Sequence, residues 1–168
     1  MKIAITDTCI FIDLHELNLT NTFFSLNIEV HTTLDVLKEL YSEQRELLSV
    51  KESSGKLTIH SISDEERGII QTLGLSRGLS ETDKTVLFLA EKVDAIILSS
   101  DNLIRKIAKQ RGIQRHGLIW IFDQLVEQCY LTFSEAHQKL TELKSMNLMY
   151  HNNPKLDVEI ENRLQKWL

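Results

Sequence analysis

Hydrophobic and polar residues follow two different periods along this chain, and the stretch 79–112 shows both most clearly. Apolar residues at helical spacing follow Ser80, and Asp83 fits the acidic arm of a capping box, so a helix is predicted to begin there. The unbroken apolar run Ala95–Leu98 predicts a strand buried on both faces of a parallel sheet. A second amphipathic helix is predicted after Asp101, with an apolar face of Ile104, Ile107 and Ala108.

The same patterns divide the rest of the chain into alternating strands and helices. Short apolar runs predict further strands at 2–7, 28–30, 57–62 (an edge strand) and 113–117. Helical spacing predicts helices over 8–17, within 18–27, over 34–44 with a polar extension to residue 55, after Ser63, over 118–128, after Thr132, and from the break at Asn152-Asn153-Pro154 to Trp167.

Strands that alternate with helices predict an α/β fold, a three-layer α/β/α sandwich around a mostly parallel sheet. The last two helices contribute no strand. We therefore expect a domain over residues 1–130 and a C-terminal helical extension, 131–168, packed on the same domain.

Composition narrows the class of protein. A length of 168 residues with one proline fits a single domain without a linker. No apolar run is long enough for a membrane span, so we expect a cytoplasmic protein without a membrane partner. Cys9 and Cys129 lie in apolar surroundings and are expected to be reduced core thiols. The net charge of −5 argues against binding nucleic acid by bulk charge, but a local basic cluster comprises Arg105, Lys106, Lys109, Arg111 and Arg115.

Four acids are the candidate chemistry. Asp7 and Asp101 follow predicted parallel strands, so both should lie at the same edge of the sheet, where α/β folds bind ligands. Asp83 begins a helix over that edge, and Glu39 (or Glu43, one turn later) could border it. Each acid alone has an ordinary explanation as a helix cap or a solvated residue. Together, however, they would repel one another unless a cation lay between them, and oxygen ligands favour Mg²⁺ or Mn²⁺.

The segments DTCIFIDL, KEL at 38–40, LSETDKTVLFLAEK and SSDNLIRKIAKQRGI resemble the PIN domain, especially small bacterial proteins of the VapC toxin type. The resemblance covers about three-quarters of the chain. It implies that Asp7, Glu39, Asp83 and Asp101 bind Mg²⁺ or Mn²⁺ and are the catalytic residues. It also implies that Ser99 binds a ligand carboxylate or a phosphate. Cys9 stands where the family commonly has Asn.

For the basic residues, two explanations stay open. Arg105 lies one helical turn after Asp101, where it either contacts a phosphate or forms a surface salt bridge. Lys109 either steers RNA or solvates its helix. The histidines at 15, 31, 60, 116, 137 and 151 show no ligand spacing, and Trp120 and Phe122 are expected in the core.

The resemblance implies a metal-dependent phosphodiesterase, an endoribonuclease specific for single-stranded RNA, and in this group such a nuclease can be the toxin of a toxin–antitoxin pair. It further implies an antitoxin partner and a homodimer, for which Trp167 and the terminal helices could offer apolar surface. The alternatives are a nuclease of RNA processing, a catalytically silent binding module and, last, a phosphorylated receiver domain, which would need an early acidic dipeptide that is not evident.

Overall fold

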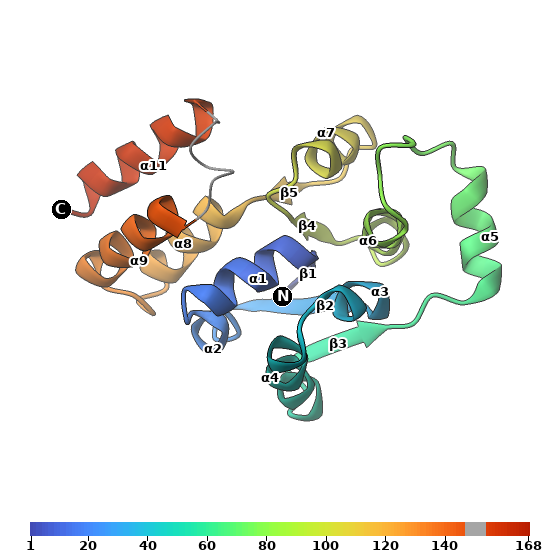
Figure 1. Cartoon of the computed structure of the whole chain (residues 1–168), viewed down its shortest axis with the longest axis horizontal. Coiled ribbons are helices and arrows are strands. Elements are labelled where there is room, and N and C mark those ends of the chain that lie inside the picture. The colour runs from blue at the N-terminus through green and yellow to red at the C-terminus, as the bar shows by residue number, and fades with distance from the viewer. Residues whose placement is uncertain (147–153) are drawn as a thin grey trace. The chain divides into compact units, whose positions relative to one another are not determined.

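The structure is a computed structural model that describes residues 1–146 and 154–168, so the predicted break at Asn152-Asn153 lies outside the described residues. Its contacts divide the chain into two units, each built from two segments (Figure 1). The first unit comprises Met1–Ile12 and Asn27–Leu118 and contains the whole sheet. The second comprises Asp13–Leu26 and Ile119–Leu168.

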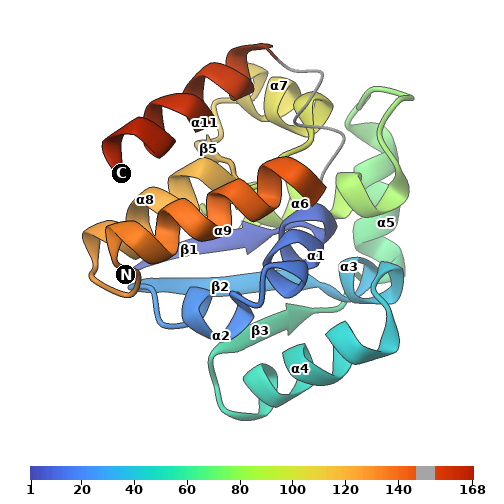
Figure 2. The ribbon, with the colours of Figure 1, turned by 60° about the vertical axis from the view of Figure 1, so that its left-hand side comes forward.

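The sheet of the first unit has five strands in the order β3-β2-β1-β4-β5, and all four pairings are parallel. Figure 2 shows β1 and β3 pointing the same way on either side of β2. This confirms the predicted α/β class and places the third strand at an edge. The strands are β1 (Lys2–Thr6), β2 (Ile28–Thr33), β3 (Leu57–His60), β4 (Ile96–Leu98) and β5 (Arg115–His116).

The strand order reverses at β1, between the pair β2, β3 and the pair β4, β5. Right-handed crossovers place the helices of the two halves on opposite faces, and the reversal opens the carboxyl edge between β1 and β4. In the first half the chain forms α1 (Thr8–Glu16), α3 (Leu34–Glu39) and α4 (Ser42–Ser53), whereas the end of α1 and all of α2 (Thr20–Phe23) belong to the second unit. Those of the second half are α5 (Asp64–Thr72), α6 (Glu81–Lys92) and α7 (Asn102–Gln110), and α6 contacts β1, β2 and β4.

Side-chain caps determine where several of these helices begin, as the sequence predicted. Ser63 and Glu66 form a capping box at α5, and Ser80 and Asp83 form one at α6. In each box two backbone N–H groups donate to side-chain oxygens, so the first helical turn does not leave them without acceptors. The Asp101 side chain caps α7 by accepting from the backbone N–H of Ile104 at 2.9 Å.

One predicted helix is divided in two. We expected a continuous helix over 34–44, but α3 ends at Glu39, and Leu40 has an extended backbone with ψ of 153°. Gln44 accepts a hydrogen bond from the backbone N–H of Tyr41 and caps a new helix, α4. The predicted apolar stripe is therefore wrong at Tyr41, whose side chain is 77% exposed.

The core of the first unit lies on both faces of its central strands. Ala4 and Ile5 of β1 and Ile97 and Leu98 of β4 are fully buried, which confirms the expectation for a parallel sheet. Burial of these apolar side chains holds the carboxyl ends of β1 and β4 side by side, where Asp7 N–H donates to the carbonyl of Leu98 at 3.1 Å.

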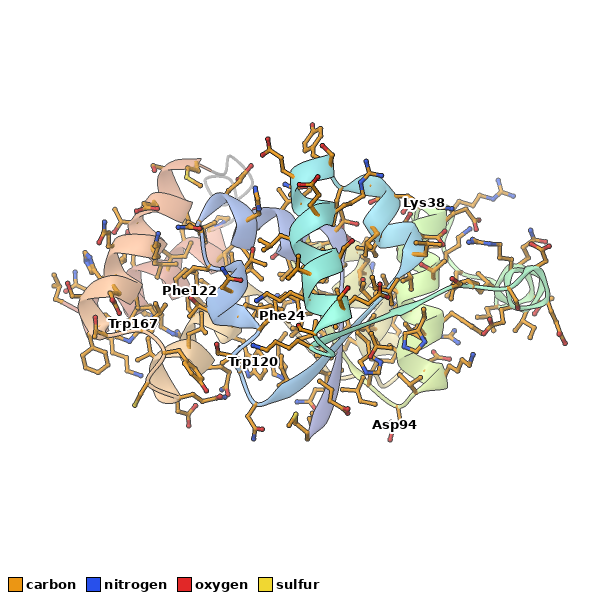
Figure 3. The ribbon with its side chains drawn as sticks, turned by 90° about the horizontal axis from the view of Figure 1, so that it is seen from below. Phe24, Lys38, Asp94, Trp120, Phe122 and Trp167 are labelled. Atoms are coloured by element: carbon orange, nitrogen blue, oxygen red, sulfur yellow. The ribbon has the colours of Figure 1, made fainter. Side chains whose placement is uncertain are left out.

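Within the described residues, the second unit comprises the end of α1, α2 and three C-terminal helices, and its apolar core includes Phe122 and Trp167 (Figure 3). Trp167 is only 1% exposed and its ring lies 6.4 Å from that of Phe122, so it is not the exposed apolar surface that we expected. The Arg163 guanidinium binds the Asp123 carboxylate in a two-pronged ion pair. The C-terminal helices of this unit are α8 (Leu118–Glu127), α9 (Phe133–Met146) and α11 (Pro154–Lys166).

Two further expectations concern this part of the sequence. Cys129 is exposed, with a φ of 64° in the turn after α8, so it is not a core thiol. Thr132 and Glu135 form the predicted capping box before α9.

Within the two described ranges, no helix is both long and apolar enough to cross a membrane.

Candidate active site

The four predicted acids gather at the carboxyl edge of the sheet in the first unit. Asp7 directly follows β1, and Asp101 follows β4 by three residues. Asp83 lies in the first turn of α6, and Glu39 is the last residue of α3. The negative charges of Glu39 and Asp101 raise the pKa of Asp83, and the charge of Asp83 raises that of Asp7. The other three carboxylates are therefore all within electrostatic reach of Asp83.

Asp7 is the most buried of these acids, with 4% of its surface exposed. Burial raises the pKa of its carboxyl from 3.8 to about 6, although three hydrogen bonds stabilise the charged form. Oδ1 accepts from the Cys9 thiol at 2.9 Å and from the Ile10 N–H at 3.3 Å, while Oδ2 accepts a short bond from the Ser99 hydroxyl. The Asp7 carboxyl therefore loses its proton only as the pH rises through about 6, unless a nearby positive charge stabilises the carboxylate.

Ser99 connects the acids of the two neighbouring strands. It is fully buried just beyond β4, and its hydroxyl oxygen donates to Asp7 and accepts from the backbone N–H of Asp101 at 3.0 Å. Of the two roles considered for Ser99, this geometry places it against a carboxylate.

Asp83 has two tasks at once. Its Oδ2 accepts from the Ser80 N–H at 3.1 Å within the capping box. Burial is the main cause that raises the pKa of Asp83, and the charges of Asp101 and Glu39 raise it further against the lowering effect of Ser80. Capping therefore explains the position of Asp83 but not the accumulation of charge around it.

Glu39 accepts from the Thr8 hydroxyl at 2.8 Å, and Thr8 is the residue directly after Asp7. Glu39 and Glu43 are both exposed, but Glu39 is a named cause of the raised pKa of Asp83 and Glu43 is not. The end of α3 at Glu39 and the new start of α4 at Ser42 separate the two acids. The geometry therefore favours Glu39.

The donor chemistry of this cluster fits a hard divalent ion. One carboxylate oxygen each of Asp83, Asp101 and Glu39 accepts no hydrogen bond from the described residues. Oxygen ligands and several negative charges are what Mg²⁺ and Mn²⁺ require. As the side chains stand, no group of three or more acids, cysteines or histidines in the described ranges is arranged around a common metal position. Metal binding would therefore draw the acids together.

Cys9 contributes a contact that sequence reasoning missed. Its thiol donates to Asp7, and its sulfur accepts from the Ser100 N–H at 3.4 Å. Cys9 thus supports Asp7 from the position where the family commonly has Asn. The sequence feature that could have indicated this contact is the position of Cys9 in the first turn of α1, two residues after Asp7.

The two predicted substrate-binding cations lie on α7, the helix that Asp101 caps. The Arg105 guanidinium lies over Gly117, where Nη1 is 2.6 Å from the position that a Cβ would occupy. Gly117 follows β5, so this guanidinium lies at the carboxyl edge of the sheet. Arg105 forms no ion pair with any described residue, and neither does the exposed Lys109. The salt-bridge explanation for Arg105 is therefore wrong in this structure.

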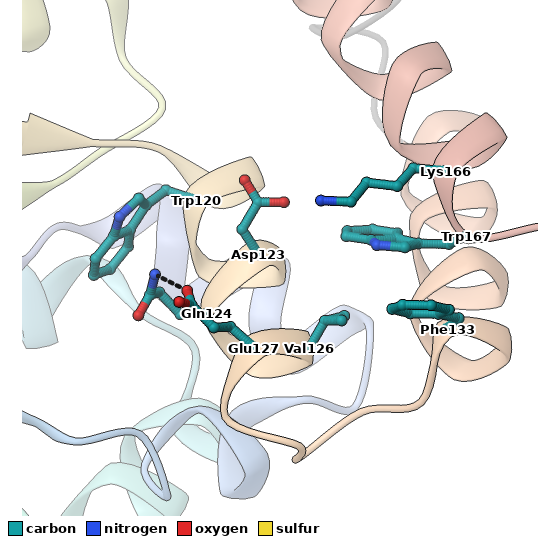
Figure 4. A pocket seen from close by; sticks show the side chains of 8 residues that line it. All are labelled: Trp120, Asp123, Gln124, Val126, Glu127, Phe133, Lys166 and Trp167. Carbon is teal, nitrogen blue, oxygen red and sulfur yellow. Dashed lines mark hydrogen bonds between the residues drawn. The ribbon is translucent and has the colours of Figure 1, made fainter.

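A pocket of about 630 Å³ lies in the second unit, and none of the predicted site residues line it (Figure 4). Its walls are Trp120, Asp123, Gln124, Val126, Glu127, Phe133, Lys166 and Trp167. Of its aromatic residues, we expected Trp120 in the core and Trp167 at an apolar surface.

The fold and the site together define a parallel α/β protein with an acid cluster at the carboxyl edge of its sheet. The family model DUF3368, described as a PIN domain, matches residues 3–163, and the chain belongs to this family. The match extends through α9 and most of α11. PIN domains are generally nucleases, so the fold is of a nuclease type.

The solved structures similar to this chain include the following two. One is a domain of a functionally unknown protein from Methanocaldococcus jannaschii, with 21% identity, a TM-score of 0.49, and coverage of 70% of this chain and 91% of that one. The other is a PilT N-terminus domain protein from Sulfolobus solfataricus, with 15% identity, a TM-score of 0.44, and coverage of 74% and 92%. A comparison with curated proteins found no match.

Proposed function

We propose that this protein is a divalent-metal-dependent phosphodiesterase, an endoribonuclease that cleaves single-stranded RNA. The observation that carries the proposal is the gathering of Asp7, Glu39, Asp83 and Asp101 at one sheet edge, with raised pKa values for Asp7 and Asp83. Such a cluster is unfavourable in the metal-free protein. Such repulsion among carboxylates is found at binding sites, where the bound ligand offsets it.

Asp7, Glu39, Asp83 and Asp101 would hold Mg²⁺ or Mn²⁺. When bound, the ion supplies a hydroxide near neutral pH and offsets negative charge on the phosphate. The chain itself provides the rest. Ser99 and Cys9 hold the Asp7 carboxylate in place, and Arg105 offers a guanidinium to a phosphate of the substrate. Lys109, one turn further along α7, attracts the RNA backbone.

The direct test incubates purified protein with end-labelled single-stranded RNA and Mg²⁺ or Mn²⁺. We expect cleavage that EDTA stops and that falls at least about 100-fold in Asp7→Asn and Asp101→Asn, because charge is lost without a change of shape. Asp64→Asn is the matched control, since Asp64 is an exposed first-turn acid outside the cluster. Full activity in Asp7→Asn would refute the proposal. A DNA strand of the same sequence tests the preference for RNA.

A catalytically silent binding module is the second candidate. It is favoured by the capping bonds of Asp83 and Asp101, which give both acids a structural use. Calorimetric titration with Mn²⁺ separates the two functions. Binding that is lost in Asp7→Asn supports the nuclease, whereas absence of binding supports the silent module.

Membership of a toxin–antitoxin pair and homodimer formation rest on the family resemblance alone. A small reading frame directly upstream, whose product suppresses the growth defect caused by this protein, would support the toxin role; its absence would favour RNA processing. Light scattering would distinguish a dimer from a monomer.

A further inference from the structure

Two histidines far apart in the sequence meet on one face of the sheet. His31 lies in β2 and His60 ends β3, with Thr33 and His60 in register. The Nδ1 atom of His31 is 3.0 Å from Nε2 of His60, and the ring planes are inclined by 31°. Both rings are half-buried, so one side of the pair remains open to solvent. The expectation that the histidines are merely scattered is wrong for this pair.

The separation of the two nitrogens matches a chelate. Metal–imidazole bonds of about 2.0–2.1 Å, at bond angles of about 90–109°, place two ligand nitrogens about 2.8–3.4 Å apart. The observed 3.0 Å falls in this interval without any movement of the backbone. We propose that His31 and His60 form a bidentate site for a transition-metal ion of the Ni²⁺, Cu²⁺ and Zn²⁺ class. Imidazole nitrogen favours these ions over Mg²⁺.

The charged surroundings are compatible with a cation. Glu29 faces His31, while Glu66 and Lys92 face His60, and Lys92 binds Glu66 at 2.8 Å. The lysine is thus paired with a carboxylate, and Glu29 adds negative charge. Burial lowers the pKa of both histidines, which keeps the rings neutral and able to bind a metal at neutral pH. The bound metal would replace the hydrogen bond that now joins the two nitrogens.

The site has a structural consequence because β3 is an edge strand that pairs with β2 only. A metal bound by one residue from each strand would fasten that edge. Such an ion would stabilise the folded chain by mass action. This role does not depend on the acid cluster, which draws on other residues and prefers hard ions.

Calorimetric titration of the full chain with Ni²⁺, in the presence of excess Mg²⁺, tests the proposal. We expect saturable binding of one ion per chain. The affinity should fall at least about tenfold in His60→Gln and His31→Asn, which keep a polar side chain able to form hydrogen bonds but lose an imidazole ligand. His137→Gln on α9 is the matched control and should bind Ni²⁺ like the unaltered chain.

A second measurement keeps the test independent of folding effects. Cu²⁺ added below stoichiometry should broaden the imidazole C–H signals of His31 and His60 together in the NMR spectrum. Circular dichroism without metal should show that the substituted chains are folded. Absence of saturable binding, undiminished binding in folded His60→Gln, or broadening at other histidines instead would each overturn the proposal.

Discussion

The Asp7 carboxylate links site chemistry to stability. Its folded-state pKa of about 6 exceeds the usual 3.8, so folding favours the protonated form. The raised pKa of Asp7 therefore adds to the free energy of unfolding fully below about pH 4, and this contribution is lost as the pH rises through about 6. The raised pKa corresponds to a cost of up to about 3 kcal/mol at neutral pH.

Asp7→Asn should therefore stabilise the metal-free protein at pH 8 by about 1–3 kcal/mol, because the amide is neutral and has a similar shape. At pH 4 the two proteins should be nearly equal in stability. Urea denaturation with EDTA at both values measures this difference. If Asp7→Asn were no more stable than the unaltered chain at pH 8, the ionised Asp7 carboxylate would not destabilise the folded protein as expected.

Cys9 should act through Asp7, since its thiol is one of the bonds that lower the pKa of this acid. Cys9→Ala should raise the pKa of Asp7, whereas Cys9→Ser should keep it near that of the unaltered chain because a hydroxyl also donates. Carbon-detected NMR titration of the Asp7 carboxyl reads the effect directly. Equal titration curves in Cys9→Ala and the unaltered chain would rule out this role.

Gly117 offers a way to move Arg105 without changing its charge. A Cβ at this position would lie 2.6 Å from the guanidinium, which must then shift, while the backbone is not in the left-handed region. Under the proposed function, Gly117→Ala should weaken RNA binding by about tenfold, as expected for loss of a charge-assisted bond. Binding to catalytically inactive protein can be measured by fluorescence anisotropy.

Two controls make this result specific. Arg105→Ala should weaken RNA binding by a similar factor, and the double substitution should add little, since both act on one contact. Gly68→Ala, in α5 with open space around the added methyl, should leave RNA affinity unchanged. Additive losses in the double substitution would show that Gly117 acts by another route.

At the scale of elements, α5 and α6 carry the same capping box in different surroundings. Ser63→Ala and Ser80→Ala should each reduce stability by about 0.5–2 kcal/mol, because each leaves a backbone N–H without its acceptor. Only Ser80→Ala should also weaken Mn²⁺ binding, since Ser80 orients Asp83. Thermal denaturation and calorimetry give the two quantities. Equal Mn²⁺ affinity in both variants would show that the Ser80 hydroxyl does not help to position Asp83 for the metal.

These boxes also show which elements the sequence could predict. A cap and an apolar stripe depend on residues within one or two turns, so α5, α6 and α7 were predicted at the correct places. The break after α3 was missed because the sequence has no proline or glycine there, and apolar spacing continues through Leu40 and Tyr41. Gln44, which caps α4, signals the break only weakly.

Contacts between distant segments were harder to predict. The edge shared by Asp7 and Asp101 could be anticipated, because parallel strands place their carboxyl ends together. The meeting of His31 and His60 depends on the register of β2 against β3, which periodicity alone does not determine. The burial of Trp167 against Phe122 depends on helix packing in the second unit, which no local pattern encodes.

At the scale of the whole molecule, each of the two units is built from two segments, and the segments of the two units alternate along the sequence. The boundary between Ile12 and Asp13 falls inside α1, and that between Leu118 and Ile119 falls at the start of α8. A helix that continues from one unit into the other cannot unfold in one of them without losing hydrogen bonds in both. We therefore expect a single cooperative unfolding transition.

The two tryptophans make this expectation testable, because Trp120 and Trp167 both belong to the second unit while the acid cluster belongs to the first. Mg²⁺ at about 100 times its dissociation constant should stabilise the folded chain by about 2.7 kcal/mol. Tryptophan fluorescence and far-ultraviolet circular dichroism should then show the same upward shift in melting temperature. In Asp7→Asn neither signal should shift. A shift confined to circular dichroism would mean that the units unfold separately, and that α1 does not couple the metal site to the helices around Trp167.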